Sequence, residues 1–283
     1  MDLYQMLIQR RSVRSFTDQP IAEEVILKLL EAANNAPSGG NIQPLSLVLV
    51  QESANRETLA GLVGNQPWVR NAPLSIIFCL DFNRVKRWAA LNHTEFKGEQ
   101  ALSHFLISYA DVMCAAQTVV ILAESLGLGS VYVGTVQSVI EQTRQAFDIP
   151  AYVLPLMVLS LGYPRSVPHT IPKLPCGVIA HREKYHHLSD QQLQQAFDQK
   201  YGELGEQKEA YLEKAFIEAI EADKQGGEGW TDWVIHEMNR LEIRNNAEFL
   251  FKLRYPTEVM IRMNSEILRS FEQAGFDLLN EKA

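Results

Sequence analysis

The chain has 283 residues, of which 46% are hydrophobic and 21% charged, an ordinary composition for a globular protein with a substantial core. This length allows one large domain or two small ones. The formal net charge of -8 argues against a general nucleic-acid-binding protein, because non-specific affinity for phosphate backbones comes from clustered lysines and arginines.

The three cysteines, Cys79, Cys114 and Cys176, are widely spaced and form no CxxC pair. This spacing indicates no disulfide framework, zinc site or iron–sulfur centre. Cys79 and Cys114 lie in apolar runs, so we expect both to be small buried residues of the core.

No targeting or membrane-spanning segment is expected. Two arginines interrupt the N-terminal segment by residue 11, which argues against a secretory signal. The longest uninterrupted apolar runs, such as residues 118–123, are far shorter than the roughly 18 residues needed to span a bilayer. We therefore expect a cytoplasmic protein that makes no membrane contact.

Helical and strand-like patterns alternate from the N-terminus onward. Apolar residues at helical spacing predict helices, and short apolar runs predict buried strands. The predicted helices cover residues 3–8, 23–34, 55–63 and 140–147, and the predicted strands cover 45–51, 74–80 and 152–161. This alternation indicates an α/β or α+β sandwich.

The stretch 103–126 is apolar on more than one face, which is typical of a central helix buried inside a fold or between subunits. Beyond Tyr185 the chain becomes rich in Gln, Glu, Lys and Asn. Helical patterns at 191–222, 229–241 and 257–274, with a flexible hinge at 225–229, predict a helical C-terminal extension. We therefore predict two parts, residues 1–187 and 188–283.

Two segments could bind a ligand. Arg10, Arg11 and Arg14 form a dense basic cluster that suits an anion, although surface arginines near a helix end are the alternative. The small polar residues of 37–44 suit a backbone cradle for a flat ligand, although a simple helix-to-strand turn would use the same residues. Residues 131–135 are interpreted as a short extended edge that presents N–H groups, although taken alone they would simply be a strand.

Other catalytic motifs are missing from the sequence. The seven histidines show no metal-ligand spacing, and the chain has no GxSxG elbow and no GxGxxG after a strand. Without a nucleophile, a metal site or an acid–base pair, the chemistry is expected to belong to a bound cofactor.

Six sequence segments occur in a recognisable order: RRSVRSF, APSGGNIQP, NQPWVRNAP with FCLDFNR, AESLGLGSVYVGTV, SLGYP and PKLPCGVIAHREKY. In these segments the chain resembles the FMN-dependent nitroreductase superfamily, specifically its branch of NADPH-dependent oxygen-insensitive nitroreductases and flavin reductases. The resemblance covers roughly residues 2–187. It implies an α+β three-layer sandwich with a central mixed or antiparallel sheet. It also implies a homodimer with long helices at the interface and FMN bound where the subunits meet.

The resemblance also implies which residues contact FMN. The phosphate, the ribityl chain and the pyrimidine edge are expected to be held by Arg10, Arg11, Ser12 and Arg14. The ring is expected to be met from the partner subunit by Ser38, Gly39 and Asn41, and touched by Gln66. The backbone that faces N5 and O4 is that of Val133, Gly134 and Thr135, and the late lysine that meets the phosphate is Lys173.

The expected activity is hydride transfer from NADPH or NADH through FMN to a small acceptor, such as a nitroaromatic, a quinone or free flavin, with no catalytic side chain. A related flavoenzyme for reductive dehalogenation or flavin fragmentation, and a non-catalytic flavin-binding module, are the alternatives. The chain departs from the branch in two places. Ile171 replaces the first of two late basic residues, and residues 222–228 offer only Lys224 where relatives place arginines for the 2′-phosphate of NADPH.

Overall fold

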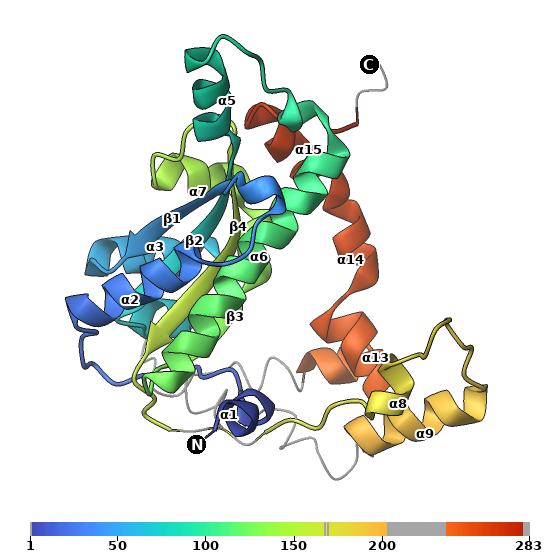
Figure 1. Cartoon of the computed structure of the whole chain (residues 1–283). Helices are drawn as coiled ribbons and strands as arrows, with labels where there is room; N and C mark the ends of the chain where they lie inside the picture. Colours follow the sequence, from blue (N-terminus) through green and yellow to red (C-terminus); the bar gives the residue numbers. More distant parts are fainter. Residues whose placement is uncertain (1, 167, 169, 203–235, 280–283) are drawn as a thin grey trace. The chain divides into compact units, whose positions relative to one another are not determined.

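The structure is a computed structural model that describes residues 2–166, 168, 170–202 and 236–279 (Figure 1). The chain forms two compact units, one of Met1–Val167 with Arg262–Ala283 and one of Pro168–Ile261. These units differ from the predicted parts, 1–187 and 188–283, at two boundaries. The second unit begins at Pro168, and the segment from Arg262 onward belongs to the first unit.

A four-stranded antiparallel sheet lies at the centre of the first unit (Figure 1). Its spatial order is β1-β2-β4-β3, so β3 is an edge strand. Every residue of β2 is buried, which agrees with its mainly apolar sequence; its two polar residues, Ser75 and Asp81, are buried with the rest. The strands are β1 (Leu45–Val50), β2 (Leu74–Asp81), β3 (Gly129–Val133) and β4 (Val153–Gly162), close to the four predicted extended segments.

Helices cover both faces of the sheet, which gives the predicted three-layer α+β architecture. In Figure 1, α2 and α6 lie in front of the sheet and α3 and α7 lie behind it. The predicted 23–34 helix is confirmed without change, because Ile26, Leu29 and Ala33 form a buried stripe. The helices of this unit are α1 (Leu3–Gln9), α2 (Glu23–Asn34), α3 (Ser53–Leu62), α4 (Pro67–Asn71), α5 (Phe82–Leu91), α6 (Leu102–Ser125), α7 (Ile140–Ala146) and α15 (Asn264–Gln273), with short 3-10 turns η1 (Gly39–Asn41), η2 (Gly98–Gln100) and η3 (Gly134–Ser138).

The long helix α6 contacts all four strands. By length and composition alone this helix could cross a membrane. The uninterrupted apolar runs of the sequence, such as 118–123, were too short to indicate this. It is instead buried against the sheet along one side, through residues such as Val112, Ala116 and Val119. Its other side is partly exposed, so the prediction that Cys114 is a core residue is wrong, whereas Cys79 on β2 is buried as expected.

The second unit contains short helices. Ser189 begins α9 with a capping box, in which the Gln192 side chain also participates. The side-chain amide of Asn246 donates to the carbonyls of Tyr201 (3.2 Å) and Gly202 (2.8 Å), which ties the following helices to the end of α9. These elements are α8 (Cys176–Ile179), α9 (Asp190–Tyr201), α13 (Asn246–Glu248), the π-helix η4 (Phe249–Arg254) and the start of α14 (Thr257–Arg262).

Two C-terminal expectations have different outcomes. The predicted hinge at 225–229 and most of the predicted helices 191–222 and 229–241 lie outside the described residues. The predicted helix 257–274 consists of two helices, α14 and α15, with a break at Met263.

The C-terminal segment completes the core of the first unit. Phe276 is 1% exposed and stacks on Phe82 with a centroid separation of 5.6 Å. Main-chain hydrogen bonds fix the same segment, from Tyr152 N to the Ala274 carbonyl (2.7 Å) and from Asp277 N to the Glu99 carbonyl (3.0 Å). The segment is therefore part of the sandwich.

Replacing Phe276 by Ala should lower the free energy of unfolding by about 3–5 kcal/mol, because it removes a fully buried aromatic ring and leaves a cavity. Urea unfolding of the purified protein measures this change. Leu279→Ala is the matched control, since Leu279 is 65% exposed and surface changes are usually within about 0.5 kcal/mol. Equal losses from the two variants would contradict the docking of this segment.

Candidate functional site

The N-terminal segment after α1 lies along the outer edge of the sheet. Ser12 forms a parallel bridge with Ser130 of β3, and Val13 N donates to the Ser130 carbonyl at 2.9 Å. Further along, Thr17 N donates to the Tyr163 carbonyl at 2.8 Å. Gly129 is required here, because a Cβ at that position would lie 2.7 Å from the Val13 side chain. The three predicted anion-binding arginines are thereby carried on an extended strand-like segment.

The arginines of this segment are half-buried and held by different neighbours. Arg11 donates to the Gln9 carbonyl at 2.9 Å, at the end of α1. The Arg14 guanidinium lies over the Trp68 ring, 5.6 Å from its centroid, in a cation–π contact with α4. Arg10 follows α1 directly as its C-cap residue.

Arg10 and Arg11 also affect two groups on neighbouring elements. Burial raises the pKa of Glu124, at the end of α6, and the positive charges of Arg10 and Arg11 offset part of that rise. Burial raises the pKa of Tyr132 on β3 to about 12, again partly offset by Arg10. Tyr132 therefore keeps its proton at neutral pH and can donate to Gln117 Oε1 at 3.2 Å. The first part of the arginine segment thus lies beside α6 and β3.

The predicted glutamine reaches the end of the same strand. Gln66 precedes α4, which begins with Pro67, and its amide Nε2 donates to Thr135 Oγ1 (3.1 Å) and to the Val63 carbonyl (2.8 Å). Val133 is buried, whereas the following Gly134 and Thr135 are exposed. The strand therefore ends in a backbone turn that is open to a ligand beside the Gln66 amide.

These contacts bring three of the predicted segments together at one edge of the sheet: residues 10–14, the Gln66 amide and the turn after Val133. Trp68 connects the first two, since it stacks on Arg14 and lies two residues after Gln66. The combination offers guanidinium groups for an anion and exposed backbone and amide groups for a polar, planar ring. We name this group the β3 site.

The predicted loop Pro37–Pro44 is held by other elements. Gly39 N donates to Asp111 Oδ1 of α6 at 3.0 Å. A Cβ on Gly39 would lie 2.6 Å from the Ile107 side chain, so only glycine allows this close approach to α6. Ser38 Oγ is buried and has no hydrogen-bond partner among the described residues. The loop therefore packs on α6, and its Ser38 hydroxyl can still form a hydrogen bond with a ligand.

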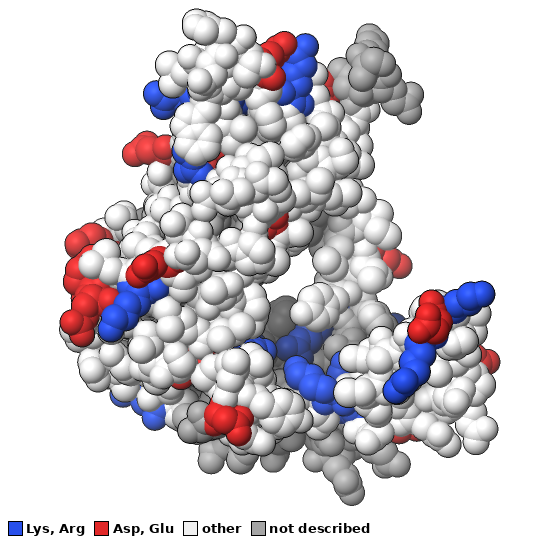
Figure 2. All heavy atoms as spheres, in the orientation of Figure 1, with Lys and Arg blue, Asp and Glu red and all other residues white. Residues whose placement is uncertain are grey.

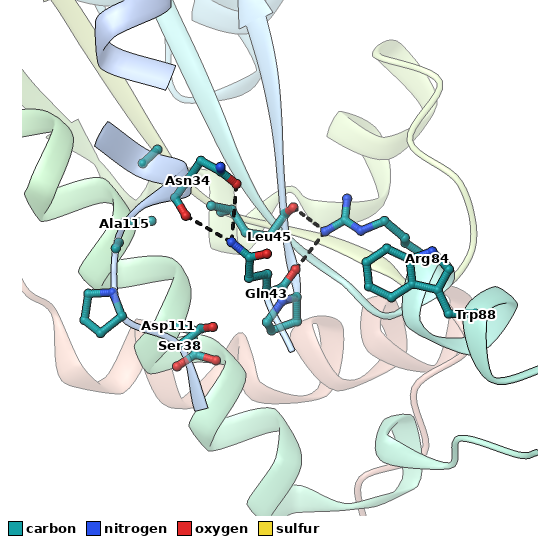
Figure 3. Close-up of a pocket in the computed structure, with 12 residues that line it drawn as sticks. Asn34, Ser38, Gln43, Leu45, Arg84, Trp88, Asp111 and Ala115 are labelled. Carbon is teal, nitrogen blue, oxygen red and sulfur yellow. Dashed lines mark hydrogen bonds between the residues drawn. The ribbon is translucent and has the colours of Figure 1, made fainter. Parts of the chain in front are cut away.

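The loop also borders a cavity of about 260 Å³ between α2, α5 and α6 (Figure 3). Figure 3 shows the Gln43 amide donating to both oxygens of Asn34, at 3.0 Å to its carbonyl and 3.3 Å to Oδ1. On the other side of the loop, the Arg84 side chain donates to main-chain carbonyls, and Trp88 lies beside it. This cavity is separate from the residues that define the β3 site.

Lys173, the last predicted contact, is exposed and lies in the second unit, so its contact with a phosphate stays a prediction. No role was predicted for Trp68, Asp111 or Arg84. Trp68 and Arg84 lie inside the recognised segments 65–73 and 78–84, which was the available signal. Asp111 had none, because a single acid on an apolar helix does not indicate what it contacts.

The chain is similar to known proteins over most of its length. The model of the nitroreductase family matches residues 7–163. The FMN reductase [NAD(P)H] of Bacillus subtilis is 35% identical over 207 residues, which cover 71% of this chain and 82% of that protein. The oxygen-insensitive NADPH nitroreductase of Salmonella typhimurium is 32% identical over 202 residues, covering 70% and 80%. The solved structure of the hypothetical oxidoreductase YcnD from Bacillus subtilis superposes with a TM-score of 0.75 at 29% identity, covering 99% of this chain and 100% of that one. The chain belongs to the nitroreductase family.

Proposed function

We propose that this protein is an FMN-dependent oxidoreductase that transfers hydride from NAD(P)H to small acceptors such as nitroaromatics, quinones or free flavin. The observation that carries the proposal is the β3 site, where an arginine segment, a glutamine amide and an exposed backbone turn are brought together along the edge strand β3. The relatives named as an NAD(P)H-dependent FMN reductase and an NADPH nitroreductase support the same reaction class.

The residues of the β3 site fit FMN. A phosphate suits the guanidinium groups of Arg10 and Arg11, which lie beside α6 and β3, since charge-assisted hydrogen bonds are the strong ones. A flat ring suits the exposed turn at Gly134, where no side chain blocks the backbone and nothing lies within 4 Å of a Cβ built there. The orphaned Ser38 Oγ is a further donor for the ring if the loop comes from the partner subunit.

When bound, FMN would supply the redox chemistry by accepting a hydride from NAD(P)H and giving it up to the acceptor. The protein's part is binding and electrostatics. Arg14, oriented by Trp68, is our candidate for stabilising negative charge at the pyrimidine edge. The amide of Gln66 and the backbone of Gly134 would orient the ring system, and protons can come from solvent.

The same proposal includes a cytoplasmic homodimer. Apolar residues that are exposed in the single chain lie on α6 and on α1, which packs against α6. The surface along α6 is mostly uncharged, whereas charged side chains gather over α2 (Figure 2). An apolar surface of this kind favours association. The exposed residues are Leu102, Leu106 and Ile107 on α6 and Leu3, Tyr4, Leu7 and Ile8 on α1.

A spectroscopic experiment tests the function directly. The purified protein should be yellow, should be bleached by NAD(P)H without oxygen, and should regain its colour when a quinone is added. A yellow protein that NAD(P)H cannot bleach would instead indicate a non-catalytic flavin-binding module. Chromatography of the released flavin should give FMN, and FAD would contradict the proposed site.

Replacing Arg11 and Arg14 together by Ala should weaken FMN binding by about two to four decades, because each lost charge-assisted contact is worth about 1.5–3 kcal/mol. Equilibrium titration of the apoprotein with FMN measures the change. The comparison variant Lys173→Ala should lose much less, since Lys173 offers a single point charge. An equal loss from Lys173→Ala alone would show that the main phosphate contact lies elsewhere.

Leu106→Asp should shift the protein from dimer toward monomer, because it puts a charge in the middle of the proposed interface. Light scattering at several protein concentrations measures the mass. Leu27→Asp is the matched control, since Leu27 on α2 is 56% exposed and Leu106 is 57% exposed. A wild-type protein that is a stable, FMN-loaded monomer would refute both the dimer and the two-subunit site.

The preference for NADPH over NADH should be weak, within about tenfold, or roughly 1.4 kcal/mol. The 222–228 segment, which lies outside the described residues, has one lysine beside acidic neighbours. Three arginines could replace the missing groups: Arg240, Arg244 and Arg254. Two of these arginines are already paired, Arg240 with Glu237 (2.6 Å) and Arg244 with Glu242 (3.1 Å). Steady-state kinetics with both donors at moderate salt measures the ratio. A preference above a hundredfold would mean that these arginines leave their partners to bind the 2′-phosphate.

A further inference from the structure

The Arg84 side chain binds main-chain carbonyls at the end of the loop Pro37–Pro44. Its Nη2 donates to the Gln43 carbonyl and to the Leu45 carbonyl, both at 2.7 Å (Figure 3). Its Nη1 donates to Ser46 Oγ at 3.2 Å. Arg84 is on α5, about forty residues further along the chain. One guanidinium therefore fixes the junction between the loop and strand β1.

Arg84 is itself held in place. The Asp81 carboxylate lies 3.5 Å from Arg84 Nη1 and also accepts from Ser46 Oγ at 2.5 Å. Asp81 caps the start of α5 by accepting from Arg84 N at 2.9 Å. The Arg84 guanidinium lies over the Trp88 ring, 5.5 Å from its centroid. These contacts orient the side chain before any ligand is bound.

The loop that Arg84 holds has a backbone that would not keep its shape unaided. Three of its residues have positive φ, namely Gly40 (59°), Asn41 (55°) and Gln43 (52°), and two of these are not glycine. Left-handed conformations at non-glycine residues have a cost and persist only where neighbouring groups enforce them. Here one end is fixed by Asp111 at Gly39 N, and the other by Arg84 at the Gln43 and Leu45 carbonyls.

We propose that Arg84 is a positioning residue for the proposed flavin reaction. It contacts no ligand itself and acts through the loop, by holding Ser38, Gly39 and Asn41 in the arrangement that meets the flavin ring of the partner subunit. This inference rests on the proposed function, because it needs FMN at the β3 site and the loop beside it. An arginine is needed because a planar guanidinium can serve two carbonyls, a hydroxyl and an aromatic face together, whereas a lysine ammonium is a point charge.

The arginine cluster 10–14 and Arg84 should therefore affect the flavin in different ways. Loss of the cluster removes phosphate contacts and weakens binding. Loss of Arg84 leaves those contacts in place and disturbs only the surroundings of the ring. A misplacement of about 1 Å in a positioning group can lower a rate by about a hundredfold, so the effect should appear in turnover more than in retention of the flavin.

The test compares Arg84→Met and Arg84→Lys with Arg87→Met in the FMN-loaded protein. Arg87 is exposed on the same helix, so Arg87→Met makes the same change of charge without touching the loop. The measurements are the visible circular dichroism of bound FMN, the FMN dissociation constant of the apoprotein, and kcat with a quinone acceptor. Thermal unfolding of each apoprotein shows whether it is folded.

We expect Arg84→Met to change the visible circular dichroism of the flavin and to lower kcat about tenfold or more, while the FMN dissociation constant changes less than about threefold. Arg84→Lys should fall between wild type and Arg84→Met in both respects, and Arg87→Met should match wild type. If Arg84→Met does not fold, Arg84→Lys decides by the same measurements.

The outcomes separate the two proposals. Wild-type protein that binds FMN and turns over, with folded Arg84 variants that match Arg87→Met in dichroism and kcat, would overturn this inference alone. A loss of FMN binding equal to that of the Arg11 and Arg14 double variant would also overturn it, since Arg84 would then be needed for flavin binding itself. Wild-type protein that binds no FMN would overturn the proposed function, and this inference with it.

Discussion

The site depends on main-chain pairing between the segment Ser12–Thr17 and the open edge of the sheet. The hydrogen bonds from Val13 N to Ser130 and from Thr17 N to Tyr163, with Arg165 N bonding back to the Ser15 carbonyl at 3.0 Å, make this segment an added border of the sheet. An unpaired edge strand is a liability, so covering it also protects the fold. Two glycines, Gly129 and Gly162, leave room for this border, because a Cβ at either would lie within 3 Å of a side chain of the segment.

That pairing links fold and function. Because backbone atoms make the contacts, the side chains are free for other roles: Val13 is buried, while Ser12 and Arg14 are only half-buried. The strand β3 then ends at an exposed turn, and Gln66 reaches that turn from the start of α4. The proposed flavin site is thus formed by the edge strand β3 and by two neighbours, the Ser12–Thr17 segment and Gln66. In the proposed dimer, the loop Pro37–Pro44, held on α6, would supply the ring contacts from the partner subunit.

Most of the first unit could be predicted from the sequence. The 23–34 helix had clear helical periodicity, and the strands β1, β2 and β4 lie in short apolar runs, of which the run 76–80 in β2 is fully buried. Two short helices were missed. Helix α4 has only five residues, too few for a periodic pattern, and its Pro67 was the one available sign. Helix α5 follows β2 without a break, so no turn or loop residues separate the two, and its N-cap Asp81 is itself the last residue of β2.

The parts of the site that could not be predicted involve contacts between distant residues. Arg84 acts on the carbonyls of Gln43 and Leu45, and main-chain atoms carry no sequence signal. Asp111 likewise meets the backbone of Gly39, 72 residues away. Cys114 was predicted to be buried because its helix is apolar all round, but the apolar character of α6 serves an outward face as well as the core. The packing of the C-terminal segment into the first unit could not be predicted either. An aromatic residue such as Phe276 indicates burial, but its sequence position does not indicate which core it joins.

The central claim is that the border segment, the Gln66 region and the turn after β3 form one FMN site. Amide hydrogen exchange of the protein with and without FMN tests it most directly. The account predicts slower exchange on FMN addition in residues 10–14, 65–68 and 133–136 together, and also in 38–43 from the proposed partner loop. Protection confined to the cavity between α2, α5 and α6, with 10–14 and 133–136 unchanged, would contradict it.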